Sequence, residues 1–188
     1  MPGLNYPAPI MPVTLYDSLE QDKKQLEYAV PVATGANFPA ATIVSVNASG
    51  QAQNYDPAVH NVALSHEATH ELVTVEQGPW LYKTGGKSNV YLVLIEGKRL
   101  VFTASWTGTT PVIYDPGTHL GQQFELAIDP VSGYTFIDLT TAGTGPFKIV
   151  GLYEAPGLPE PTNTALPDER RQNARVIVEV DPTAVFIP

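Results

Sequence analysis

The sequence predicts an all-β protein, either a β-barrel or a jelly-roll-like β-sandwich. Its 18 prolines and 15 glycines interrupt the 188 residues too often for long helices. The apolar segments between these breaks are rich in valine, isoleucine, threonine, tyrosine and phenylalanine, which favour strands. Turn residues recur at roughly the 8 to 12 residue spacing that is typical of barrels and sandwiches. We therefore expect a β-domain over residues 29–188, preceded by a different kind of segment at residues 1–28.

Residues 1–16 are expected to form an extended arm. Prolines at positions 2, 7, 9 and 12 delete backbone donors, so the segment is neither a helix nor a central strand. It is also too apolar for a solvated tail. We expect the arm to lie on another surface, in the same chain or on a neighbouring subunit, and its removal to leave the β-domain folded. A frayed terminus is the alternative. The expected contact residues are Leu4, Tyr6, Ile10, Val13 and Leu15.

Residues 17–28 carry the clearest helical pattern in the chain. Asp17 and Glu20 have the spacing of a capping box, and the leucines at positions 15, 19 and 26 fall roughly on one face. We expect one short helix here, between the arm and the first strand.

Strands are expected throughout the β-domain. Alternation is clearest at Phe124, Leu126 and Ile128 and again over residues 176–180, where every second side chain should face the core. A turn near Gly97 indicates a hairpin end between two strands. The segments with strand patterns are residues 28–35, 41–57, 71–76, 89–97, 98–106, 110–117, 122–129, 134–141, 145–155 and 174–187.

A long proline-rich loop is expected at residues 155–168, between the last two strands. The segment carries four prolines and no packing pattern. Loops of this length inside a compact domain are usually functional or mobile.

Charge and composition exclude several classes of function. The formal net charge is −9 and the sequence pI is near 4.7, so nucleic acids and anionic membranes, which are also negative, are not expected as partners. The absence of cysteine excludes disulfides, thiolate metal sites and cysteine nucleophiles. No segment has the pattern of a signal peptide or the length of a membrane span. We expect the protein to stay in the cell that made it until that cell lyses.

The stretch SHEATHE, residues 65–71, contains the H-E-x-x-H motif of zinc hydrolases. In that chemistry His66 and His70 would bind zinc and Glu67 would act as general base on the metal's water. The motif requires a helix, yet the residues after His70 are β-branched and soon reach a Gly-Pro pair. Position 76, where a third histidine would stand, is a glutamate. We expect a surface loop here, and the zinc hydrolase remains an alternative.

Two other groups of residues could belong to a site. Asp115 and His119 lie close together in the chain, as in part of a catalytic triad, but Asp-Pro-Gly is typical of a tight turn. Trp80, Tyr82 and Trp106 could stack on sugars, or could belong to the core. A carbohydrate-binding β-sandwich, such as an adhesin module, is therefore a second alternative.

Three stretches resemble the auxiliary capsid proteins of tailed bacteriophages, which are called decoration, cement or head-stabilising proteins. Residues 29–57 are similar to the strand-turn-strand opening of these proteins. Residues 124–154 resemble their hairpin and following F-x-I-V-G-L strand, and residues 174–186, ARVIVEVDPTAVF, resemble their closing strand. The resemblance covers somewhat under half of the chain. The helical pattern at residues 17–28 and the SHEATHE stretch depart from it.

The resemblance implies a virion structural protein that binds the outside of an expanded capsid and locks neighbouring major capsid subunits together. It implies a dimer or trimer, with the major capsid protein as partner, located on the capsid exterior after synthesis in the host cytoplasm. Catalysis, cofactors and metals do not belong to that role. We therefore expect no enzyme activity, no cofactor and no metal.

Overall fold

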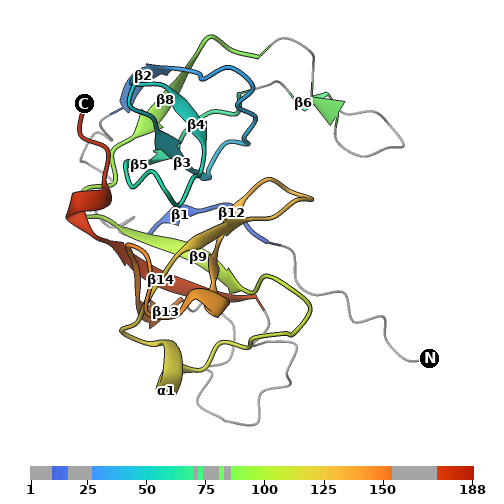
Figure 1. Cartoon of the computed structure of the whole chain (residues 1–188), viewed down its shortest axis with the longest axis vertical. Coiled ribbons are helices and arrows are strands. Elements are labelled where there is room, and N and C mark those ends of the chain that lie inside the picture. Colours follow the sequence, from blue (N-terminus) through green and yellow to red (C-terminus); the bar gives the residue numbers. More distant parts are fainter. Residues whose placement is uncertain (1–9, 17–26, 70–71, 74–80, 83–85, 154–172) are drawn as a thin grey trace.

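The protein is all-β, as the sequence predicts. A computed structural model describes residues 10–16, 27–69, 72–73, 81–82, 86–153 and 173–188. Strands assemble into a five-stranded sheet, a seven-stranded sheet and a two-stranded sheet (Figure 1). Within the described residues, helix is confined to the four residues of α1 (Pro116–His119) and two 3-10 turns, η1 (Leu139–Thr141) and η2 (Pro182–Ala184).

The five-stranded sheet is antiparallel and curls until its two ends meet. Its order is β2-β8-β5-β3-β4. Just beyond β2, Val32 forms a bridge with Ala52 of β4, and Ala33 N–H donates to the carbonyl of Ala52 at 2.9 Å. The strand bounds are β2 (Glu27–Pro31), β3 (Ile43–Val46), β4 (Ala52–Asn54), β5 (Val62–Ser65) and β8 (Asn89–Val93).

The seven-stranded sheet closes into a small barrel. Its order is β10-β13-β14-β9-β12-β11, with β1 added to β9. The bounds are β1 (Thr14–Leu15), β9 (Arg99–Ser105), β10 (Gln123–Phe124), β11 (Leu126–Ile128), β12 (Thr135–Asp138), β13 (Phe147–Leu152) and β14 (Ala174–Val180). β10 and β11 stand at opposite ends of this order, yet only Glu125 separates them in the chain. One bent segment therefore pairs with β13 on one side and β12 on the other, which closes the sheet.

Two hydrophobic cores result from strand alternation. Along β3, Ile43 belongs to a core shared with the barrel, whose fully buried members include Phe102 and Phe147. The next residue, Val44, belongs to a second core inside the curled five-stranded sheet, together with Leu92. The five-stranded sheet is therefore apolar on both faces, and one of them packs against the barrel.

The chain also crosses between the two sheets after β14. Val185 forms a parallel bridge with Val62 of β5, and Phe186 N–H donates to the carbonyl of Val62 at 2.9 Å. Thr135 of β12 and Thr42, the residue before β3, also join the two sheets through their hydroxyls at 3.1 Å. Both hydroxyls are buried, and this contact satisfies them.

The described part of the arm is built into this junction, which corrects the expectation that residues 1–16 can be removed without harm to the fold. Val13 is 1% exposed and lies in the shared core, against which Leu15 also packs. Val13 N–H donates to the carbonyl of Ala41 at 2.8 Å, and β1 pairs with β9. These residues stabilise the fold, and Val13 has no surface left for a partner. Leu4 and Tyr6 lie outside the described residues.

Three further expectations need correction. The turn at Gly97 is not a hairpin end, because β8 and β9 belong to different sheets and the turn carries the chain from one to the other. Residues 110–117 form no strand; an irregular segment leads into α1 instead. Ile128 is exposed, since β11 leaves the core after Leu126. The alternation in β14 is as expected, with Val176 and Val178 fully buried.

The expected helix at residues 17–28 falls mostly outside the described residues. Its last two positions, Glu27 and Tyr28, belong to β2 and are not helical. The proline-rich segment 155–168 and Trp80 also lie outside the described residues.

Candidate functional site

The SHEATHE stretch leaves β5 at Ser65 and continues through bends over residues 66–69. His66 N–H donates to the carbonyl of Tyr91 at 2.9 Å, and its Nδ1 lies 2.8 Å from Oε1 of Glu27. The carboxylate of Glu67 forms an ion pair with Lys87 at 3.2 Å. The side chains of His66 and Glu67 are therefore both paired with charged residues from other parts of the chain.

The described residues of the zinc motif, 66–69, are not helical. Thr69 is buried, and its Oγ1 accepts a hydrogen bond from Phe38 N–H at 3.1 Å, which holds the chain away from a helical path. His70 and Glu71 lie outside the described residues. Over the part of the chain that the structure describes, no three His, Cys, Asp or Glu side chains are grouped so as to hold a metal ion. The described residues of the motif therefore do not form the helix that the zinc hydrolase requires.

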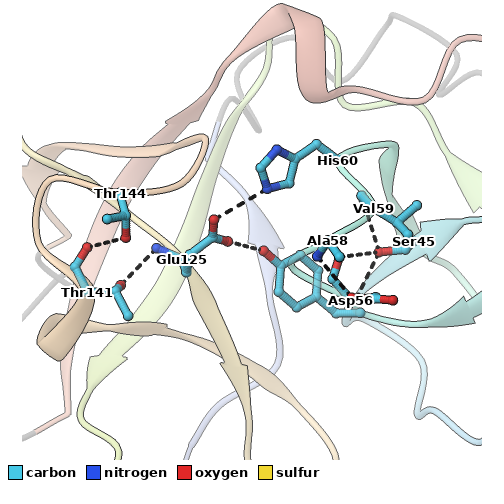
Figure 2. A network of polar contacts seen from close by, with 9 residues as sticks. Ser45, Asp56, Ala58, Val59, His60, Glu125, Thr141 and Thr144 are labelled. Atoms are coloured by element: carbon cyan, nitrogen blue, oxygen red, sulfur yellow. Dashed lines mark hydrogen bonds and ion pairs between the residues drawn. The ribbon is translucent and has the colours of Figure 1, made fainter.

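A polar cluster lies where the five-stranded sheet meets the barrel (Figure 2). Tyr55, after β4, donates a hydrogen bond from its hydroxyl to Oε2 of Glu125 at 2.5 Å. Oε1 of the same carboxylate lies 3.3 Å from Nε2 of His60. Glu125 is the residue that separates β10 from β11. One carboxylate at the closure of the barrel thus contacts two side chains from the other sheet.

Local hydrogen bonds hold the loop that carries Tyr55 and His60. Ser45 Oγ accepts from Asp56 N–H at 3.0 Å and donates to the carbonyl of Val59 at 3.2 Å. The Asp56 carboxylate accepts from Ala58 N–H at 2.9 Å, a turn favoured by an Asp-Pro pair. The loop is therefore held against β3 as well as against Glu125.

On the barrel side, the backbone of Glu125 is also held. Its N–H donates to Thr141 Oγ1 at 2.9 Å, and its carbonyl accepts from Asp138 N–H at 3.0 Å. Gly145 lies directly against this bend, with φ of +76°; a Cβ on it would stand 2.3 Å from the Phe124 carbonyl oxygen. The bend therefore depends on a glycine at position 145.

Burial decides the protonation of the cluster's tyrosine. Burial first, and then the hydrogen bond and charge of Glu125, raise the pKa of Tyr55. The hydroxyl therefore stays protonated and acts as donor. The side chains of Glu125 and His60 are 19% and 45% exposed, so this end of the cluster is open to water. The cluster joins the two sheets as a structural contact. Its His60 end is exposed to solvent.

Two shallow depressions flank the loop at residues 33–36. One, of about 380 Å³, is bordered by Tyr55 and Asp56, and the other, of about 400 Å³, by Gly86 and Lys87. Each is lined by a single charged side chain, and neither is lined by Glu125 or His60. These depressions do not bring together an acid, a base and a nucleophile.

Asp115 caps the short helix α1, and His119 is the last residue of that helix. Asp115 precedes α1, and its carboxylate accepts from Gly117 N–H at 3.0 Å, so the expected turn is one short helical turn. His119 is buried between Tyr114 and Phe124, and its Nδ1 accepts from Asp115 N–H at 2.9 Å. Burial lowers the pKa of His119, partly opposed by the charge of Asp115. His119 therefore packs α1 against Phe124 of the barrel, and Asp115 caps the helix.

The described part of the arm combines backbone anchoring with exposed apolar side chains. Met11 N–H donates to Thr103 Oγ1 at 3.1 Å, while the Met11 side chain is 46% exposed. The carbonyl of Pro12 accepts from Nη2 of Arg175 at 3.3 Å. Tyr16 is partly exposed and forms an edge-to-face contact with Tyr153. The backbone of residues 10–16 is thus hydrogen-bonded to the barrel, while the side chains of Met11 and Tyr16 are exposed at the surface.

Sequence reasoning missed the Tyr55–His60–Glu125 cluster. Glu125 stands at a polar position of the alternation over residues 124–128, so the pattern gives no signal of a cluster. Trp106, expected as a candidate sugar-stacking residue, is half-buried just after β9. Among the described residues no helix is long and apolar enough to cross a membrane. No protein-family model, curated protein or solved structure matches the chain.

Proposed function

We propose that this chain is a virion structural protein that binds the outer surface of a tailed-phage capsid and stabilises contacts between major capsid subunits. The observation that carries the proposal is the anchoring of the arm. Residues 10–16 are tied to the barrel by β1 and to the loop before β3 by Val13 and Ala41. Apolar residues upstream of this anchor are therefore attached to a stable β-structure, as a clasp requires.

The proposed contact set follows from this anchoring. Leu4, Tyr6 and Ile10 remain as contacts to the capsid or to a neighbouring copy, and the half-exposed Met11 extends the set. Val13 and Leu15 serve as the anchor. Contacts of a few apolar side chains are individually weak, but many copies on one lattice make the binding effectively permanent.

The three stretches that resemble decoration proteins fall on ordered elements. Residues 29–57 make the β2 to β4 part of the five-stranded sheet, and residues 124–154 and 174–186 supply most of the barrel. The three stretches therefore lie in both sheets. The proposed partner is the major capsid protein, and the proposed location is the capsid exterior.

The test is co-sedimentation with expanded capsid shells that lack this protein. We expect the full chain to bind, and a chain without residues 2–9 to lose binding while its thermal unfolding is unchanged. A double substitution, Leu4→Ser with Tyr6→Ser, should weaken binding in the same way. Lys98→Ala, on the turn between the sheets, is the matched control and should bind normally.

Full binding by the chain without residues 2–9 would remove the arm from the mechanism. No binding by the full chain would contradict the capsid function itself. In that case stoichiometric zinc in the purified protein, lost in His66→Ala, would support the hydrolase alternative, and glycan binding lost in Trp106→Ala would support the adhesin alternative.

A further inference from the structure

The outer edge of β2 carries backbone groups without a partner among the described residues. Val32 N–H donates to the carbonyl of Ser88 at 3.0 Å, and the register places Val30 opposite Val90. Because bonded residues alternate along an antiparallel pair, Tyr28 and Val30 also point their backbone groups at β8. Those of Glu27 and Ala29 point away from the sheet.

The open part of this edge is short. From Val32 onward, β4 takes over the edge through its bridge at Ala52. Before that point Glu27, Tyr28 and Ala29 are all exposed. Such an edge is a template for another strand. A partner strand can therefore pair with only about three residues of β2, Glu27 to Ala29.

The edge suits a second copy of the same chain. The net charge of −9 makes copies repel each other in general. Glu27 is the one charged side chain of β2, and its carboxylate already lies 2.8 Å from Nδ1 of His66. The side chains around it, Tyr28, Ala29 and Tyr91, are uncharged and exposed. This edge therefore opposes self-association less than the chain's overall charge does.

We propose that two copies associate by antiparallel pairing of β2 with β2 across a two-fold axis at Tyr28. In this register Glu27 of each copy faces Ala29 of the other. Both outward N–H groups and both outward carbonyls of each strand are then used, because each Glu27–Ala29 pair exchanges two hydrogen bonds. Pro31, which has no N–H, stays outside the pairing.

The side chains fit the same register. The two Tyr28 residues stand directly opposite each other as a non-hydrogen-bonded pair, the closer kind, in which aromatic side chains interact favourably. Tyr28 is 39% exposed in the single chain, so its ring is available. On the other face, Tyr91 stands next to Ala29, whose small side chain leaves room for the partner strand. This pairing is independent of capsid binding.

Disulfide trapping tests the axis directly, because the chain contains no cysteine. Tyr28→Cys would place two thiols opposite each other at a Cα separation of about 4.5 Å, within the range that a disulfide spans. We expect rapid formation of a covalent dimer under mild oxidation. Tyr91→Cys, somewhat more exposed but one strand further from the axis, is the matched control and should not cross-link. Equal cross-linking of the two variants, or none, would overturn the proposal.

Amide exchange supplies a test on the unmodified chain. At high protein concentration the N–H groups of Glu27 and Ala29 should exchange several-fold more slowly than on dilution, while those of Tyr28 and Val30 stay protected throughout. Ala29→Pro removes an outward N–H but leaves every hydrogen bond to β8 in place, and it should sediment as a monomer. Ala29→Thr keeps the N–H and should sediment as a dimer. A monomeric wild type at all concentrations, or dimeric Ala29→Pro, would contradict the pairing.

Discussion

The hydroxyl of Tyr55 and the carboxylate of Glu125 meet at 2.5 Å across the junction of the two sheets. The tyrosine comes from the loop after β4, and the glutamate from the bend that closes the barrel. The same contact therefore joins the sheets and holds the bend. Its loss should affect the stability of the whole chain.

Tyr55→Phe should lower the free energy of unfolding by about 1 to 2 kcal/mol at pH 8, because Glu125 loses a buried donor. The folded pKa of Tyr55 is raised above its ordinary 10.0, so its contribution is complete below pH 10 and is lost as the pH rises further. The stability difference between wild type and Tyr55→Phe should therefore shrink above pH 10, as measured by urea unfolding. Tyr91→Phe, at an exposed position, is the control and should match wild type at pH 8.

Gly145→Ala should destabilise the chain by about 3 kcal/mol or more, because the new Cβ meets the Phe124 carbonyl and the backbone has positive φ. Gly143→Ala is the matched control. Gly143 has φ of +86° with no atom within 4 Å of a new Cβ, so only the conformational cost of about 1 kcal/mol remains. Thermal unfolding of both variants measures the difference; equal losses would mean that the contact with Phe124 is unimportant.

Ala41→Gly should stabilise the chain by up to about 1 kcal/mol. Ala41 has φ of 56°, a conformation that favours glycine, and its backbone receives the hydrogen bond from Val13. The gain is partly offset by the greater freedom of glycine in the unfolded chain. Ala127→Gly in β11 is the control: it adds the same freedom to the unfolded chain but relieves no positive φ. We expect it to lower the free energy of unfolding by about 1 kcal/mol. A lower free energy of unfolding in Ala41→Gly would show that the positive φ of Ala41 does not strain the backbone.

His119 should make stability fall as the pH falls. Its folded pKa is lowered, so its contribution is present above the ordinary value of 6.5 and is lost as the pH falls toward the folded value. His119→Asn keeps an acceptor for Asp115 N–H without the titration. We expect this variant to be less stable than wild type at pH 7.5 and to approach it toward pH 5 in urea unfolding. Parallel pH profiles would show that His119 takes up its proton in the folded chain.

Val13→Ala should cost about 2 kcal/mol of unfolding free energy, because it leaves a cavity in the shared core. Met11→Ala, at a half-exposed side chain two residues earlier, should cost less than about 0.5 kcal/mol. Chemical unfolding of the two variants separates the anchor from the exposed part of the arm. Similar effects would contradict the anchoring of the arm at Val13.

Local patterns in the sequence predict most strands correctly. The Asp-Pro pairs at Asp115 and Asp181 also act locally, since each carboxylate accepts an N–H two residues later. The errors concern relations between distant parts of the chain. A turn at Gly97 reads as a hairpin whether the next strand returns to the same sheet or enters another, and Val13 looks like any apolar residue of an arm.

The cluster at the junction was unpredictable for the same reason. Tyr55 and Glu125 are 70 positions apart, and neither belongs to a motif. Only the closure of the barrel at Glu125 brings the carboxylate to the loop after β4. The pattern of residues 124–128 predicts a straight strand, because periodicity carries no information about a bend that serves two sheet edges.

The strand order also sets an order for folding during synthesis. All strands of the five-stranded sheet come from residues 27–93, so this sheet has its full set while the barrel has only β1 and still lacks β9 to β14. β9 emerges next, but its neighbour β14 comes last among the strands, so one edge of β9 stays unpaired for most of the remaining translation. Such an edge is open to wrong partners. We expect the nascent chain to depend most on chaperones in this interval, until the pairing of Val185 with Val62 joins the late barrel to the early sheet.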